Sequence, residues 1–150
     1  MAIDDDIAVL AAAPLLRFFG RDALRLLSFA AERRDLAPDE ILFRRGEATD
    51  GGFVVVSGRV VLVPQAAGAA PVEAGRAALI GQMALFVRGE RPGDARAAEP
   101  TSVLRITPAL MRRVLEEFPD AAAAIHDALA EDLAGLSQGL ERVRGLLAAG

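Results

Sequence analysis

Cysteine and lysine are both missing from this chain of 150 residues. Without cysteine, the protein has no disulfide, no zinc site built on thiolates and no cysteine nucleophile. Without lysine, all 17 basic residues are arginines, and we interpret this bias, together with the many alanines, as a mark of GC-rich coding.

Targeting segments are missing as well. Residues 1–6 are acidic and carry no basic leader, so they do not form a signal peptide. Their three aspartates, at positions 4–6, instead suit the N-terminal end of a helix. The longest apolar runs fall far short of a membrane span. We therefore expect a soluble cytoplasmic protein with no membrane partner.

Charge and chemistry-bearing side chains argue against several function classes. The net charge is −4, whereas a surface that binds nucleic acid needs a basic patch to neutralise phosphates. His126 is the only histidine, and no thiol could share a metal with it. No Ser-His-Asp set or Walker-type loop occurs, and Glu116 and Glu117, adjacent on an expected helix, do not share a face. We expect neither an enzyme nor a bound metal or cofactor.

The order of helix-like and strand-like segments predicts one α+β domain. A hydrophobic content of 53% in a chain of this length suits a single unit with a substantial core. N-terminal helices are expected in residues 1–33, strands in 34–106 and C-terminal helices in 107–150. Pro14 interrupts the first helical pattern, and a second helix is predicted over residues 21–33.

The central segment alternates β-prone runs with turn signals. Ser57-Gly58 is a two-residue hairpin signal between two valine-rich runs. Short strands are expected at 41–43, 53–56, 59–63, near Val72 within a mobile loop at 65–76, at 79–80 and at 103–106. Short strands placed between helices predict an α+β fold with a barrel or roll at its centre.

The C-terminal segment is predicted to be helical. Thr107 and Pro108 suit the N-cap and first residue of one helix, and a long helix is expected over residues 120–148. Its apolar residues follow the spacing of a coiled-coil seam at Leu129, Leu133, Leu136, Leu140, Val143 and Leu147. This seam favours a homodimer through residues 129–147, and a helix packed back on its own domain is the alternative. No helix-turn-helix domain is expected in the chain.

One stretch between residues 43 and 60 carries a family resemblance. A glycine is followed four residues later by an aspartate, then by an aromatic residue and a Gly-x-Val, at Gly46, Asp50, Phe53, Gly58 and Val60. This pattern resembles the paired-glycine signature of cyclic-nucleotide-binding domains. The resemblance implies a jelly-roll-like, double-stranded antiparallel β-roll of about eight strands, flanked by N-terminal helices and a long C-terminal helix.

A second stretch is similar to the phosphate-binding cassette of the same family. Its two parts are Gly81-Gln82-Met83-Ala84-Leu85 and Arg91-Pro92-Gly93-Asp94, and the arginine follows the glycine by ten residues, as in the family. The resemblance implies that these residues bind a cyclic nucleotide, cAMP in preference to cGMP. Independently of the family, a glycine before a short helix exposes N–H groups to an anion, and an arginine can bind a phosphate with two hydrogen bonds.

The cassette departs from the family pattern at three positions. Gln82 replaces the glutamate that accepts from the ribose hydroxyl, Pro92 removes a main-chain donor, and Asp94 places a negative charge where serine or threonine is usual. Together these changes predict binding weaker by about a hundredfold or more. Two hypotheses follow: a stand-alone nucleotide sensor that signals through its C-terminal helix, or a degenerate roll that binds no nucleotide and contacts an unknown protein partner.

Overall fold

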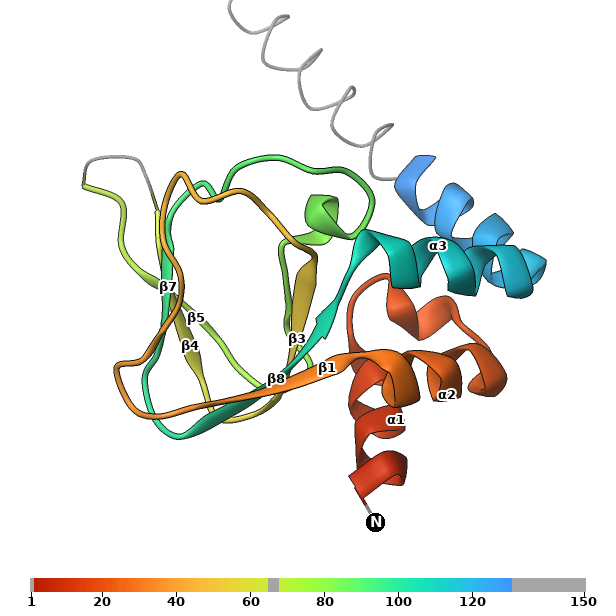
Figure 1. Cartoon of the computed structure of the whole chain (residues 1–150), viewed down its shortest axis with the longest axis horizontal. Coiled ribbons are helices and arrows are strands. Elements are labelled where there is room, and N and C mark those ends of the chain that lie inside the picture. The colour runs from red at the N-terminus through yellow and green to blue at the C-terminus, as the bar shows by residue number, and fades with distance from the viewer. Residues whose placement is uncertain (1, 65–67, 131–150) are drawn as a thin grey trace, which may run out of the picture.

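Two antiparallel sheets and a group of helices make up the computed structural model, which describes residues 2–64 and 68–130 (Figure 1). The sheets face each other as a roll, and the helices gather at one side of it. Eight strands are present in the described residues, all paired antiparallel. The predicted α+β fold, a β-roll flanked by helices, is confirmed.

Each sheet has four strands that are far apart in sequence. The first sheet has the order β1 (Glu32–Leu36), β8 (Thr101–Ile106), β3 (Gly52–Ser57) and β6 (Leu79–Ile80). The second sheet has the order β2 (Ile41–Phe43), β7 (Asp94–Ala97), β4 (Val60–Val63) and β5 (Val72–Ala74). The expected short strand near Val72 is therefore present as β5. The first part of the cassette follows β6 of the first sheet, and its second part ends at the start of β7 in the second sheet.

The helices lie before, between and after the strands. They are α1 (Ala2–Ala12), η1 (Leu16–Phe18), α2 (Arg21–Ala30), η2 (Gln82–Leu85) and α3 (Pro108–Glu117), followed by a helical segment over residues 119–130. The prediction of a helix over 21–33 was wrong at its end. The helix stops at Ala30, and β1 begins at Glu32 because its backbone pairs with β8.

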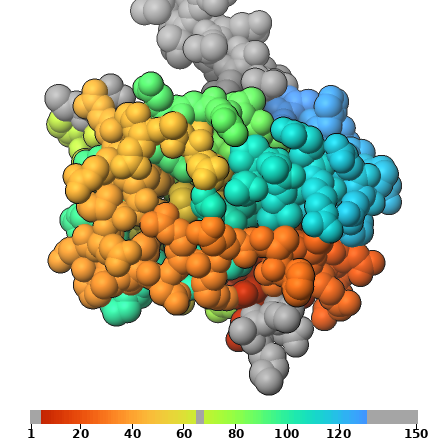
Figure 2. Space-filling view, viewed as in Figure 1, coloured from red at the N-terminus to blue at the C-terminus, as the bar shows by residue number. Residues whose placement is uncertain are grey.

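Two groups of buried side chains hold the molecule together. The helical core contains Leu10, Leu16, Leu27, Met111 and Val114, and it reaches the outer face of the first sheet through Val54 and Leu104. The roll core lies between the sheets and contains Phe43, Phe53, Val55, Val60 and Val103. In the space-filling view the roll and the helices meet without a visible gap (Figure 2).

An ion pair joins the first helix to the roll. Asp6 is buried and accepts two hydrogen bonds from Nη2 of Arg33 on β1, at 2.7 and 2.6 Å, and Nη1 of Arg33 donates to Ser102 Oγ on β8. This aspartate thus does more than complement the helix dipole, which was its only predicted role. Its contact fixes α1 against the first sheet.

The junction between the roll and α3 has the N-cap and first helical residue that were predicted from the sequence. The Thr107 hydroxyl accepts from the Leu110 N–H at 3.1 Å, and Pro108 is the first helical residue.

The expected coiled-coil seam lies almost entirely outside the described residues, which include only Leu129 of its members. Within the part of the chain that the structure describes, no helix is long and apolar enough to span a membrane.

Candidate functional site

A cavity of about 390 Å³ opens in the roll, and its volume is within the usual range of small-molecule sites. We call it the Arg91 cavity. Its described lining is Phe43, Leu62, Val63, Pro64, Val72, Ile80, Gly81, Arg91, Pro92, Gly93 and Asp94. Most of these side chains are apolar, and Arg91 and Asp94 are the charged ones. The cavity can therefore hold an apolar body with a polar or charged group.

Arg91 is the buried cation of this cavity. Its exposed fraction is 5%, its Nη2 donates to the Gly51 carbonyl at 2.7 Å, and its guanidinium lies over the rings of Phe43 and Phe53. Burial lowers the pKa of Arg91, while the charges of Glu47 and Asp50 act in the opposite direction. In the described part of the chain no carboxylate forms an ion pair with it. Such a buried, unpaired cation is suited to receive an anion.

Gly81 makes room for this arginine. Its φ of +78° lies in the left-handed region, and a Cβ at this position would lie 2.8 Å from Arg91 Nη1. The short helix expected after it is present as η2, a 3-10 helix whose first N–H groups have no acceptor within the helix. Gly81 thus brings an arginine and free backbone donors to one place.

The remaining cassette residues divide between two cavities. Gly81, Arg91, Pro92, Gly93 and Asp94 line the Arg91 cavity. A second cavity of about 400 Å³, which we call the η2 cavity, shares Gly81, Arg91 and Pro92 with the first. Its other lining residues are Thr49, Gln82, Met83, Ala84, Val87, Gly89 and Glu90. Leu85 lines neither, because its side chain is fully buried in the helical core.

Pro92 and Asp94 are both exposed, but Pro92 precedes the strand β7 whereas Asp94 belongs to it. Asp94 is the first residue of β7 and pairs with Val63, and its carboxylate accepts from the Arg45 N–H at 2.7 Å. Between them, Gly93 is buried so close to β4 that a Cβ would lie 2.0 Å from the Val63 carbonyl oxygen. The negative charge at the cavity is therefore held by the roll.

The signature aspartate has a structural role. Asp50 forms an ion pair with Nη1 of Arg105 on β8, whose Nη2 donates to Glu32 Oε2 on β1 at 2.6 Å. Burial alone would lower the pKa of Arg105, but the hydrogen bond to Glu32 and the charge of Asp50 outweigh it and raise the pKa. This network joins the start of β3 to β8 and β1, close to the carbonyl that holds Arg91.

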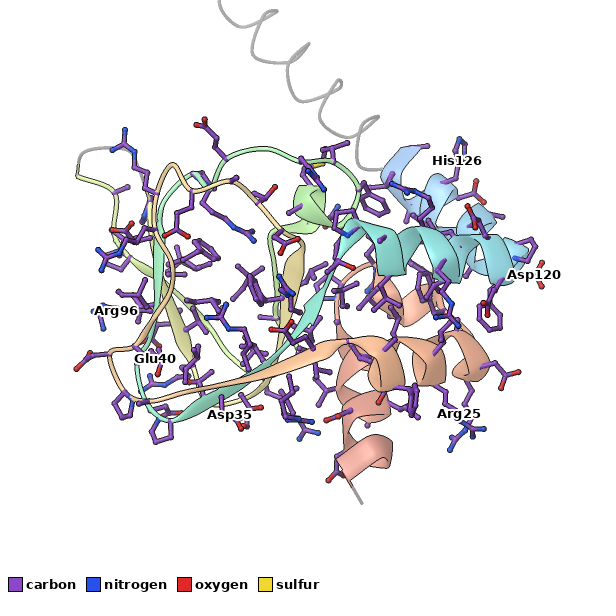
Figure 3. All side chains as sticks on the ribbon, viewed as in Figure 1. Arg25, Asp35, Glu40, Arg96, Asp120 and His126 are labelled. Atoms are coloured by element: carbon purple, nitrogen blue, oxygen red, sulfur yellow. The ribbon has the colours of Figure 1, made fainter. Side chains whose placement is uncertain are left out.

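Three contacts of the site were not predicted from sequence: the Gly51 carbonyl and the Phe43 and Phe53 rings around Arg91. The sequence indicated these residues only through their positions beside the signature. Gly51 and Phe53 follow the signature aspartate, and Phe43 precedes the signature glycine. The charged residues of the helical segment over residues 119–130 are not part of the described lining of the Arg91 cavity. His126, 3.6 Å from Asp127, and Asp120 project from the helical side of the molecule (Figure 3).

A family model described as the cyclic nucleotide-binding domain matches residues 33–118, which is more than half of the chain. The chain belongs to this family. The matched range includes Arg91, all the described lining residues of its cavity and all of α3. The predicted family resemblance is therefore confirmed. A comparison with curated proteins gave no match.

Solved structures agree with this membership of the cyclic nucleotide-binding domain family. A cyclic nucleotide-binding-like protein from Brucella abortus bv. 1 str. 9-941 is 36% identical, with a TM-score of 0.67 over 75% of this chain and 99% of the other. The N-terminal domain of a transcriptional regulator from Streptomyces coelicolor A3(2) is 24% identical, with a TM-score of 0.80 over 88% and 94%. The Thermus thermophilus catabolite activator protein shares the fold at 24% identity and a TM-score of 0.70, over 88% of this chain and 63% of that protein.

Proposed function

We propose that this cyclic nucleotide-binding domain is a non-enzymatic sensor whose Arg91 cavity receives a cyclic nucleotide. The phosphate would accept hydrogen bonds from Arg91 and from the N–H groups that follow Gly81, and the base would lie against the apolar lining. We infer cAMP as the preferred ligand over cGMP. The single observation that supports this most is the buried guanidinium of Arg91, which faces a cavity and has no carboxylate partner among the described residues.

Asp94 and Pro92 support weak rather than tight binding. Asp94 lines the cavity with its charge fixed by the Arg45 N–H, so a bound phosphate would meet a like charge. Pro92 has no N–H to donate to that phosphate. We therefore expect the affinity to be low.

The signal would leave the domain through its C-terminal helix. Ligand binding would change the position of this helix and its pairing with a second copy through residues 129–147. Leu129 packs against the helical core, and the other seam residues lie outside the described part of the chain. Light scattering of the full chain with and without cAMP tests this pairing, and a monomer at every concentration would overturn it.

The ligand proposal is tested by calorimetric titration of the full chain with cAMP and with cGMP. Replacing Arg91 by glutamine removes charge-assisted hydrogen bonds, so we expect a loss of affinity of about tenfold to more than a hundredfold. Arg88→Gln is the matched control, because Arg88 is exposed and lines neither cavity; it should leave the affinity unchanged. Circular dichroism checks that both variants fold.

The alternative is a roll kept as an interaction module that binds no nucleotide. Asp94 is the observation that favours it, because its carboxylate belongs to the lining of the cavity that would receive the phosphate. Titrations of the wild type that give no heat and no shift in melting temperature at saturating cAMP and cGMP would support this alternative. Equal affinities for Arg91→Gln and the wild type would show that any binding occurs elsewhere.

A further inference from the structure

Among the described residues Arg91 has no opposing charge in contact with it, although it is buried, and this has to be compensated. Moving an ionised group out of water is unfavourable unless other groups replace its hydration. The hydrogen bond to Gly51 satisfies one part of the guanidinium, and the carboxylates of Glu47 and Asp50 act on it only through space. Some other group must stabilise the charge and keep the plane of the guanidinium in a fixed orientation.

Two aromatic rings fill this role. The Cζ atom of Arg91 lies 4.4 Å from the centroid of the Phe43 ring and 5.3 Å from that of Phe53. Both distances are within the range over which a ring face attracts a cation. The two rings are themselves stacked, with centroids 6.1 Å apart and an angle of 29° between their planes. The arginine therefore lies against an aromatic pair.

The rings come from different sheets and have different surroundings. Phe53 belongs to β3 of the first sheet and Phe43 to β2 of the second, so the guanidinium lies where the two sheets meet. Both rings belong to the roll core, but only Phe43 is in the described lining of the Arg91 cavity, and Phe53 also lies 6.0 Å from the Cζ atom of Arg34. Phe43 is also the ring nearer to the guanidinium. It is thus the ring whose contact bears directly on the cavity.

We propose that Phe43 is a positioning residue for anion binding. Its ring keeps the Arg91 guanidinium flat beside Gly81, with Nη2 on the Gly51 carbonyl and the remaining donors available to the cavity. Because the charge is already stabilised without an anion, Arg91 stays in this place in the empty protein. This inference rests on the proposed function in one respect, namely that the anion is the phosphate of a cyclic nucleotide.

The test compares three variants of the full chain. Phe43→Leu removes the ring face and keeps an apolar side chain, Phe43→Tyr keeps the ring face, and Phe19→Leu is the matched control. Phe19 is as buried as Phe43 but belongs to the helical core, away from the cavity. We expect calorimetry to give about tenfold weaker binding of cAMP and of inorganic phosphate for Phe43→Leu. Phe43→Tyr and Phe19→Leu should bind within about threefold of the wild type.

A second measurement does not depend on binding. A proton above the face of an aromatic ring resonates upfield, so the Nε proton of Arg91 should be shifted upfield in the nuclear magnetic resonance spectrum of the ligand-free wild type. The Arg91→Lys spectrum assigns this signal. The upfield shift should shrink in Phe43→Leu and persist in Phe43→Tyr and Phe19→Leu.

The outcomes separate the two proposals. A wild type that binds neither probe, but shows the ring-dependent shift, overturns the proposed function and supports the positioning of Arg91. An Arg91 signal that does not respond to Phe43→Leu overturns the positioning role, whatever the affinities. Equal losses of affinity in Phe43→Leu and Phe19→Leu would also overturn it, because the effect would then be a general loss of packing.

Discussion

The helical core and the roll core are built from the same kinds of residues but are filled differently. In the helical core, Leu10, Leu16 and Leu27 are fully buried, and two cavities beside this core are smaller, at about 230 and 250 Å³. The roll core has buried valines and phenylalanines too, but beside them lie an arginine and a cavity of about 390 Å³. Close packing stabilises a fold, whereas an incompletely filled interior leaves room for a ligand. On the proposed function, the chain would thus separate stability from binding in space.

The largest expected effect, on the free energy of unfolding, comes from replacing one leucine by alanine in each core. Leu16→Ala should lower the free energy of unfolding by about 2–5 kcal/mol, because it opens a hole in a filled core. Leu62→Ala should cost about 1 kcal/mol or less, because Leu62 is half-buried and already faces empty space. Urea denaturation monitored by circular dichroism measures both values. Equal losses would show that the two cores are filled alike.

A smaller effect, on affinity, is expected from the double variant Pro92→Ser/Asp94→Thr. It returns a main-chain donor and a hydroxyl to the cavity and removes a like charge, so cyclic nucleotides should bind about tenfold more tightly or better. The threonine hydroxyl can accept from the Arg45 N–H only without charge assistance, so stability should fall by about 1 kcal/mol. Calorimetry and urea denaturation follow the two quantities. A double variant that does not bind would favour the interaction module.

The smallest effect is expected for Gln82→Glu, less than about threefold in affinity. Gln82 lines the η2 cavity and is not part of the lining of the Arg91 cavity. A glutamate would also bring negative charge near a negative ligand. The same titration measures it, and a gain larger than that of the double variant would show that the η2 cavity holds the part of the ligand that matters most.

The strands that the sequence did not predict are those with little β-propensity of their own. β1 has the sequence Glu-Arg-Arg-Asp-Leu, and β7 is Asp-Ala-Arg-Ala. Neither has a run of β-branched or aromatic residues, so local preference gives no signal. β1 forms because β8 pairs with all five of its residues, and β7 forms between β2 and β4. Tertiary pairing overrides propensity in both, whereas the valine-rich β3 and β4 were predicted.

The contacts of the site differ in the same way: some join residues that are close in sequence, and others join residues that are far apart. The spacing from Gly81 to Arg91 can be read along the chain, and it predicted that both belong to one site. The Phe43 ring, the Gly51 carbonyl and the Arg45 N–H reach the site across 40 residues or more in sequence. A sequence pattern contains no information on these contacts unless the register of the strands is known. For this reason the sequence indicated that Asp94 adds a negative charge to the cassette, but not that it begins a strand.

The junction after the roll has a mechanical consequence. A single residue, Thr107, separates the end of β8 from the start of α3, and its side chain is occupied in capping the helix. With φ fixed at Pro108, few rotations remain between strand and helix. The direction in which α3 leaves the roll is therefore set by β8. Beyond α3 the described chain leaves helical geometry at Phe118, with φ −127° and ψ 80°, before the helix resumes at residue 119. If ligand binding moves the C-terminal segment relative to α3, we expect the rotation to occur at Phe118.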